Sequence, residues 1–420
     1  MSGASQYKLI AFDVEGILIP EARFLFFEVA WKLGIKKFIL SAFFGLLYKA
    51  GFLSLKRAVK LIYRLFKGMH VQTFISFFEQ VPFLPDAEMV ISDLKKNGWK
   101  IAFISSSVPV IALKKLNERF KADYLQGPEI GLDGDCLTGE IWGEVLETEG
   151  KALALKRILS NNIHVNPFCV GVADDRNNLP MLEICNIKIA FNADIFVTQI
   201  SDYIIRESLF ELTEFLQSEM KERRVGRNLS PRDIIRELIH MSGFILPFLC
   251  ISFFDRYYAS SIVFLASTLY AVSEIERLTG RNVPIISRIT TMAAGKFELY
   301  SFVSSPLFYA FAIIGALLFY SETISYVSIT VLTLGDSFAT LFGKLLGRTK
   351  IPFNKTKNLE GTIFGFIAAF LGCLCFTDPF RAFVASFVGM SIELLPSPVN
   401  DNITIPLGAA LSIVPTFPKM

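Results

Sequence analysis

The second half of this 420-residue chain consists largely of long uncharged apolar stretches, and these restrict its possible folds more than any other feature. Residues 1 to about 220 mix charged and apolar residues as a globular domain does, whereas residues 238–418 hold long uncharged stretches. Hydrophobic residues make up 52% of the chain and its mean hydropathy is +0.47, which is too apolar for a purely soluble protein. The sequence therefore predicts membrane-spanning helices that follow a soluble domain.

A helical bilayer crossing needs about 20 apolar residues, and seven segments approach that length. Several are short, so we expect six or seven spans. The segments lie at roughly 238–254, 257–273, 299–321, 323–343, 361–377, 382–400 and 402–418. The predicted organisation is a soluble domain at 1–220, a basic juxtamembrane linker at 221–236 and a polytopic all-α membrane domain at 237–420.

Basic residues beside the predicted spans indicate their orientation. The residues before the first span include Lys221, Arg223, Arg224, Arg227, Arg232 and Arg236. Because Lys and Arg accumulate on the cytoplasmic side, this flank is expected there, and alternating spans bring the loop at 344–360 to the same side. No signal peptide is expected, since Met1 to Lys8 leads directly into an apolar strand-like run. We expect an integral membrane protein whose soluble domain and active sites face the cytoplasm.

A lone acid, Asp336, ends an apolar run and is followed by a basic, glycine-containing loop. An ionised carboxylate is costly in a membrane unless a cation or hydrogen bonds compensate it, so such an acid indicates a functional site. The cations that follow are Lys344, Arg348, Lys350, Lys355 and Lys357. The pattern predicts a nucleotide site at the membrane surface, with magnesium on one side and phosphates on the other.

Acidic, hydroxyl and lysine side chains follow predicted elements of the soluble domain in order. One apolar strand ends in Asp13-Val14-Glu15-Gly16, a second in Ser105, and a third in Ala173-Asp174, while Lys151 opens an amphipathic helix between the last two. In an open α/β sheet, ligands bind at the carboxyl ends of the strands. Alone, the first motif fits a plain strand-to-turn acid pair equally well.

Over residues 7–210 this order of motifs resembles the haloacid dehalogenase-like phosphatases, most closely the phosphoserine phosphatase branch. The resemblance implies a Rossmann-like α/β domain with a helical cap at about 24–80 and a phosphomonoester substrate. It also implies catalytic roles: Asp13 as the nucleophile that forms an aspartyl phosphate, Glu15 as general acid and base, Ser105 and Lys151 as phosphoryl ligands, and Asp13 and Asp174 as magnesium ligands.

Two departures from the family pattern leave a degenerate binding or regulatory domain as an alternative. Glu15 stands where the family usually has Asp, and Asn178 stands where it usually has an acid, which removes a charge near the metal. The cap is rich in basic and aromatic residues. It is open whether they form a solvated basic face or a surface that lies on anionic lipid, with a lipid phosphate as substrate.

The motifs of residues 230–418 resemble the CTP-dependent dolichol kinase, phytol kinase and diacylglycerol kinase family. They read RELIHMSG from Arg236, GDSFATLFGKLLGR from Gly335, PFNKTKNLEGT from Pro352 and DNITIP from Asp401. The third motif is also similar to phosphatidate cytidylyltransferases. The kinase resemblance implies CTP as phosphate donor and a lipid alcohol as acceptor, of polyprenol, isoprenoid or diacylglycerol type.

The candidate residues of this site divide by expected role. Asp336 is expected on the metal with Asp401 or Glu360 beside it, and Asp401, His240 and Glu393 are open as the catalytic base. The residues expected to bind the nucleotide are Lys344, Arg348, Lys350, Lys355, Lys357, Glu360, Asn402, Arg236 and His240. Glu360 could equally cap a helix, and Asn402 could brace a turn.

The sequence thus favours a bifunctional membrane enzyme, a CTP-dependent lipid kinase fused to a magnesium-dependent phosphatase. Two alternatives remain at this point, a CDP-lipid-forming cytidylyltransferase and a phosphatase with a non-catalytic membrane anchor. The expected partners are a lipid alcohol, the bilayer and a phosphomonoester, and no nucleic acid is expected. The oligomeric state is not predicted.

Overall fold

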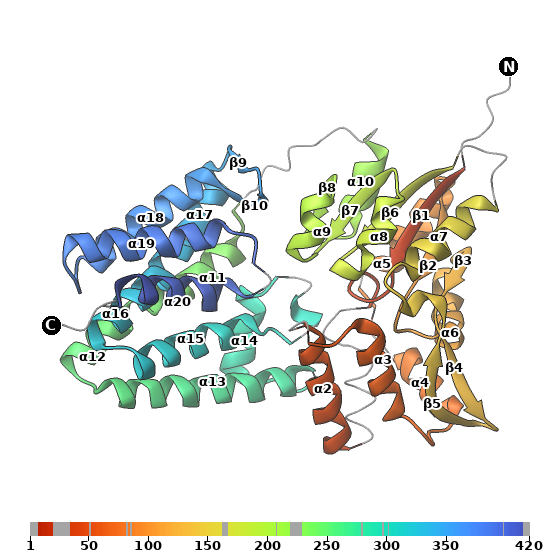
Figure 1. The fold of residues 1–420 in the computed structure, drawn as a ribbon, viewed down its shortest axis with the longest axis horizontal. Coiled ribbons are helices and arrows are strands. Elements are labelled where there is room, and N and C mark those ends of the chain that lie inside the picture. Colours follow the sequence, from red (N-terminus) through yellow and green to blue (C-terminus); the bar gives the residue numbers. More distant parts are fainter. Residues whose placement is uncertain are drawn as a thin grey trace. The chain divides into compact units, whose positions relative to one another are not determined.

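The computed structural model describes residues 7–19, 34–49, 52–80, 83–84, 86–161, 167–206, 208–218, 229–278, 280–295, 298–300, 302–397 and 399–414. The chain divides into two compact units, Met1–Arg223 and Arg224–Met420 (Figure 1). Of the predicted linker, residues 221–228 lie outside the described residues, and its last residues already belong to a helix, α11 (Pro231–Ser242).

The first unit is built on a six-stranded parallel sheet in the order β3-β2-β1-β6-β7-β8. Its strands are β1 (Lys8–Asp13), β2 (Lys100–Ile104), β3 (Tyr124–Gln126), β6 (Phe168–Ala173), β7 (Ile187–Phe191) and β8 (Tyr203–Ile205). The central strands are nearly continuous apolar runs, as expected for parallel strands buried on both faces. The predicted α/β class is confirmed, and β1 lies in the middle of the sheet.

Helices and one hairpin complete this unit. The helices are α2 (Ile35–Lys49), α3 (Leu55–Arg64), α4 (Val71–Gln80), α5 (Ala87–Lys96), α6 (Val110–Phe120), α7 (Gly150–Ser160), α8 (Leu179–Glu183), α9 (Ile195–Ile200) and α10 (Phe210–Gln217). The segment predicted as a cap contains α2 to α4, and its residues 24–33 lie outside the described residues. The antiparallel hairpin β4 (Glu129–Asp133) and β5 (Cys136–Trp142) packs against α3 and is absent from the sequence prediction.

The second unit is helical, which confirms the predicted all-α class. Its helices after α11 are α12 (Ile245–Ser252), α13 (Arg256–Leu278), α14 (Pro284–Ala293), α15 (Ser305–Phe319), α16 (Glu322–Thr330), α17 (Ser337–Leu346), α18 (Leu359–Cys373), α19 (Pro379–Leu394) and α20 (Asp401–Ile413). A π-helical segment, Val331–Asp336, joins α16 to α17. The short strands β9 (Lys350–Ile351) and β10 (Asn354–Asn358) form the loop before α18.

Three helical stretches are long and apolar enough to cross a bilayer, judged by length and composition: Pro231–Ser252, Arg256–Leu278 and Glu322–Leu346. They coincide with the first, second and fourth predicted spans. Helices α15, α18, α19 and α20 overlap the other predicted spans but have only 13 to 16 residues. Among the described residues, three helical stretches therefore reach the length of a bilayer crossing, and the other predicted spans coincide with shorter helices.

Small residues bring α17 and α18 into close contact. A Cβ atom added to Gly361 would lie 2.5 Å from the carbonyl oxygen of Ala339, a distance that real structures do not allow. Small residues at helix contacts permit this close packing inside membranes. The contact fixes α17, which begins directly after Asp336, against the start of α18.

Candidate functional sites

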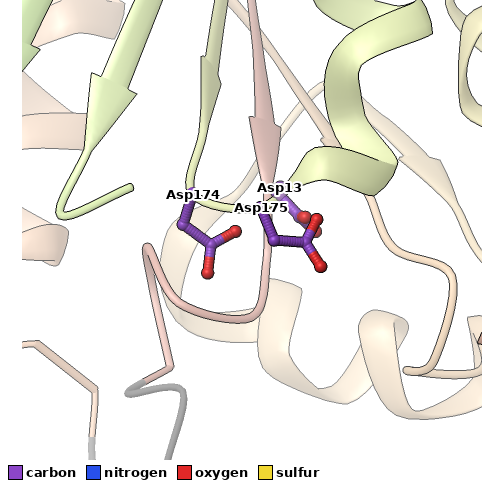
Figure 2. Close-up of side chains that lie close together, drawn as sticks. All are labelled: Asp13, Asp174 and Asp175. Carbon is purple, nitrogen blue, oxygen red and sulfur yellow. The ribbon is translucent and has the colours of Figure 1, made fainter. Parts of the chain in front are cut away.

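Three carboxylates gather at the carboxyl ends of β1 and β6. Asp13 ends β1, and Asp174 and Asp175 follow β6 directly, so the parallel pairing of the two strands brings them together (Figure 2). One oxygen from each of the three side chains lies within 4.8 Å of the others. The sequence prediction included Asp13 and Asp174 as metal ligands and missed Asp175, although Asp175 lies beside Asp174 in the same motif.

Asp13 is buried in a network of hydrogen bonds. Its Oδ2 accepts from Lys151 Nζ at 2.7 Å and from Asn178 Nδ2 at 2.6 Å, and its Oδ1 accepts from the Val14 amide at 2.8 Å. Burial by itself lowers the pKa of the Lys151 ammonium, but the charges of Asp13 and Asp175 outweigh it and hold this pKa above its usual value. Lys151 is therefore a permanent cation beside Asp13.

Asn178 connects the lysine to the carboxylates and was not predicted as a site residue. Its Oδ1 accepts from Lys151 Nζ at 2.7 Å, while its Nδ2 donates to Asp13 and, at 2.8 Å, to Asp175 Oδ1. An amide makes both kinds of bond at once, whereas an ionised carboxylate only accepts. The sequence signalled Asn178 only as the loss of an acid, and the structure shows a fully bonded amide.

The three carboxylates fit a magnesium ion, which prefers oxygen ligands. Gly16 leaves the space that Asp174 occupies, because a Cβ atom on Gly16 would lie 1.8 Å from Asp174 Oδ2. Gly16 also has φ +78°, a backbone conformation that favours glycine. Burial raises the pKa of Asp175, and a nearby cation would favour its ionised form. Asp13, Asp174 and Asp175 are therefore the residues that could hold the metal.

Ser105 and Glu15 flank these carboxylates. Ser105 follows the residue that pairs with Asp13 in the sheet, and its Oγ accepts from the amides of Ser107 and Val108 at 3.2 and 2.9 Å. Glu15 lies in the turn after β1, and its charge adds to burial in raising the pKa of Tyr63 on α3. Glu15 thus lies in the turn that follows Asp13, and Ser105 lies directly after β2, the strand that pairs with β1.

One residue of α2, Tyr48, reaches the acidic motif and was not predicted. Its hydroxyl donates to Asp175 Oδ2 at 3.3 Å and accepts from Asn177 Nδ2, while the Arg176 guanidinium lies 5.9 Å from its ring centroid. Burial raises the pKa of Tyr48, so the phenol keeps its proton and can donate it. No motif or spacing marks Tyr48 in the sequence.

A second polar cluster lies in the helical unit, around Asp336 at the end of the π-helical segment. His240 Nδ1 lies 3.9 Å from Asp336 Oδ2 and 3.3 Å from Ser337 Oγ, and its Nε2 lies 3.1 Å from Asn402 Oδ1. His240 comes from α11, Ser337 from α17 and Asn402 from α20, and Asp336 ends the π-helical segment before α17. Short π-helical segments inside α-helices are frequent at functional sites.

Lys357 lies next to this cluster with two further acids. Its Nζ donates to Glu393 Oε1 at 2.5 Å and to Asp401 Oδ2 at 3.0 Å, and Glu393 also accepts from Thr362 Oγ1 at 3.1 Å. Lys357 and Asp401 both interact electrostatically with Asp336. The structure therefore brings the predicted residues Asp336, His240, Asn402, Asp401 and Lys357 into one region.

Arg236 pairs with Glu237 on the same helix, Nε to Oε1 at 3.0 Å. Glu237 is 3% exposed, interacts electrostatically with Asp336 and bonds to Ser337. It was missed, although it adjoins Arg236 in the first motif. Glu237 therefore extends the cluster around Asp336 by one more carboxylate.

The other predicted residues bond elsewhere. Lys344 donates to Asp233 Oδ1 at 2.5 Å. Glu360 accepts from the amide and hydroxyl of Thr349 at 3.0 and 2.8 Å, so it braces the turn before β9. Lys350 donates to the Lys355 carbonyl at 3.1 Å, and Arg348 and Lys355 are exposed. These cations lie on the loop around β9 and β10 and on the end of α17.

Known proteins of two kinds resemble this chain. Residues 10–183 match the family model of haloacid dehalogenase-like hydrolases. The phosphoserine phosphatase of Idiomarina loihiensis is 30% identical over 159 residues, which cover 37% of this chain and 71% of that protein. The phosphoserine phosphatase of Archaeoglobus fulgidus is 28% identical over 222 residues, 52% of this chain and 62% of that protein.

Among solved structures, a phospho-aspartyl intermediate analogue of phosphoserine phosphatase has 25% sequence identity and a TM-score of 0.45, covering 51% of this chain and 99% of that one. Phytol kinase 1 of Arabidopsis thaliana is 27% identical over 220 residues, which cover 47% of this chain and 70% of that protein. The chain belongs to the haloacid dehalogenase-like hydrolase family through residues 10–183, with phosphoserine phosphatases among its homologues, and it also has phytol kinase homologues, as a fusion would.

Proposed function

We propose that the protein is a bifunctional membrane enzyme. Its first unit hydrolyses a phosphomonoester through an aspartyl phosphate, and its helical unit transfers a phosphoryl group from CTP to a lipid alcohol of isoprenoid or diacylglycerol type. The supporting observation is that each unit gathers carboxylates and a cation from separate elements: Asp13 and Lys151 are buried, and Asp336 and Lys357 are partly buried. Both sites are expected on the cytoplasmic face of the membrane.

In the phosphatase, an Asp13 oxygen attacks phosphorus while the bond from phosphorus to the leaving oxygen breaks. Lys151 and Ser105 bind the phosphoryl oxygens, and Glu15 protonates the leaving alcohol. Glu15 then takes a proton from the water that attacks the aspartyl phosphate, which frees inorganic phosphate and restores Asp13. A magnesium ion held by the three aspartates would offset the repulsion between carboxylate and phosphate.

In the kinase, the acceptor hydroxyl oxygen bonds to the γ-phosphorus of CTP as the bond to the β–γ bridging oxygen breaks, and CDP leaves. The hydroxyl proton passes to His240 or Asp401. Lys357 and the cations of the 344–357 segment stabilise the negative charge of the triphosphate. Asp336 is the proposed metal ligand, which would bring a divalent cation to the triphosphate oxygens.

Labelled CTP tests the reaction of the helical unit. Full-length protein in lipid nanodiscs is incubated with magnesium, a panel of lipid alcohols and CTP labelled at either the γ- or the α-phosphate. A lipid that gains only the γ-label supports the kinase. A lipid that gains the α-label would instead identify a cytidylyltransferase, and no label in any lipid would contradict both.

Two matched variants separate the two activities. Asp336→Asn is expected to abolish lipid labelling and keep hydrolysis of p-nitrophenyl phosphate, and Asp13→Asn is expected to do the reverse. Each variant is the folding control for the other. Unchanged lipid labelling in Asp336→Asn would remove this residue from the proposed site.

A further inference from the structure

One face of α2 is apolar and exposed although it belongs to the soluble unit. Ile39, Leu40 and Phe43 are 58%, 42% and 51% exposed, and Lys36 is exposed one turn before them. These four residues have the spacing i, i+3, i+4 and i+7, so they share one face of the helix. Phe52, just after α2, is 79% exposed. Adjacent large apolar side chains on a surface indicate an interaction site.

The opposite face of α2 is bound to the phosphatase unit. Ser41 is 1% exposed, and Tyr48, two turns further along the same face, makes the contacts with Asp175, Asn177 and Arg176. Helix α2 also packs against α3 (Figure 1). Its exposed apolar face and its contact with the acidic site therefore belong to one rigid element.

The charge of this region indicates which surface would cover α2. From Ile35 to Met69 the sequence has no acidic residue, and its basic residues are Lys36, Lys37, Lys49, Lys56, Arg57, Lys60, Arg64 and Lys67. A helix with an apolar face and flanking cations binds the interface of anionic membranes. The same chain carries helices long and apolar enough to cross a bilayer, so the first unit is covalently linked to a membrane-type domain.

We propose that α2 docks on an anionic lipid bilayer, with Ile39, Leu40 and Phe43 in the headgroup region and Lys36 beside lipid phosphates. Because Tyr48 joins the same helix to Asp175, docking holds the phosphatase site at the lipid surface. The substrate of that site is then a phosphate monoester carried by a membrane lipid, a conclusion that rests on the phosphatase activity proposed above.

Photo-crosslinking tests the docking without any need for turnover. Phe43 is replaced by p-benzoylphenylalanine in the full chain, reconstituted in phosphatidylglycerol nanodiscs, and the adducts are identified by mass spectrometry. The matched control carries the same replacement at Met89 of α5, which is 59% exposed. We expect at least tenfold more lipid adduct at position 43. Equal yields, or adducts to peptides of residues 229–414, would overturn the docking.

A second pair of measurements tests the substrate class. The double variant Ile39→Asp with Phe43→Asp is expected to lower hydrolysis of a long-chain alkyl phosphate in these nanodiscs at least tenfold and to leave hydrolysis of soluble p-nitrophenyl phosphate unchanged. Met89→Asp is the control. Equal losses on both substrates would overturn the inference. Lipid adducts at position 43 in a protein that hydrolyses neither substrate would support the docking and contradict the phosphatase.

Discussion

At the scale of single residues, Asn178 differs most from its expected role. The missing acid removes a charge near the metal and left a degenerate domain as an alternative, but the amide bonds to Lys151, Asp13 and Asp175 at once. Asn178→Ala removes the donor from two carboxylates, and hydrogen bonds to charged groups contribute about 1.5–3 kcal/mol each. We expect kcat for p-nitrophenyl phosphate to fall roughly 10- to 100-fold. Asn161→Ala, at an exposed position after α7, is the control. An unchanged kcat would contradict the role of Asn178.

A second residue-scale prediction concerns Asp123, which joins the start of β2 to β3. Burial by itself raises the pKa of Asp123, but hydrogen bonds from Lys100 at 2.9 Å and the Ile101 amide at 3.0 Å outweigh it and leave the pKa below its usual value. A depressed carboxylate pKa contributes stability above the unfolded-state value, near 3.8, and loses it as the pH falls through the folded-state value.

Asp123→Asn should therefore destabilise the phosphatase unit at pH 7, by about 1–2 kcal/mol. The difference from the wild type should shrink as the pH falls below 4. The measurement heats both proteins at a series of pH values and assays the surviving phosphatase activity at pH 7. A difference that stayed constant down to pH 3 would show that the ionised form of Asp123 is not the source of this stability.

At the scale of elements, the sequence predicted those site residues whose positions follow from strand ends and local motifs. Asp13, Ser105 and Asp174 follow apolar runs, and their approach results from parallel pairing alone. Tyr48 could not be predicted, because its contact with Asp175 spans 127 residues and depends on how α2 packs. The pairing of Lys344 with Asp233 could not be predicted for the same reason. A motif indicates the chemistry of a residue but does not identify the residue that pairs with it.

The contact of α17 with α18 gives an element-scale prediction. Gly361→Val should lower CTP-dependent lipid labelling at least tenfold, because its Cβ would lie 2.5 Å from the Ala339 carbonyl oxygen and force α17 away from α18. Gly315→Val on α15 is the matched control, since no described atom outside its own helix lies within 4 Å of an added Cβ there. Phosphatase activity reports on the first unit in both variants. Equal labelling by the two variants would refute the importance of this contact.

At the scale of the whole molecule, two compact units with separate polar clusters should respond to different ligands. A ligand that binds only the folded form stabilises it by RT ln(1 + [L]/Kd), about 2.7 kcal/mol at a hundredfold excess over Kd. CTP with magnesium should therefore raise the unfolding temperature of the helical unit and leave that of the phosphatase unit unchanged, provided that the units unfold separately.

Thermal scans in nanodiscs measure this response, with pyrene-labelled exposed Cys375 reporting on the helical unit and phosphatase activity on the first. Asp13→Asn should keep the CTP-dependent shift, because Asp13 belongs to the first cluster. Lys357→Ala should lose it, because removing this cation leaves Glu393 and Asp401 unpaired where the triphosphate would bind. A CTP shift that survives in Lys357→Ala but disappears in Asp13→Asn would place the nucleotide in the phosphatase unit and reverse the assignment of the two sites.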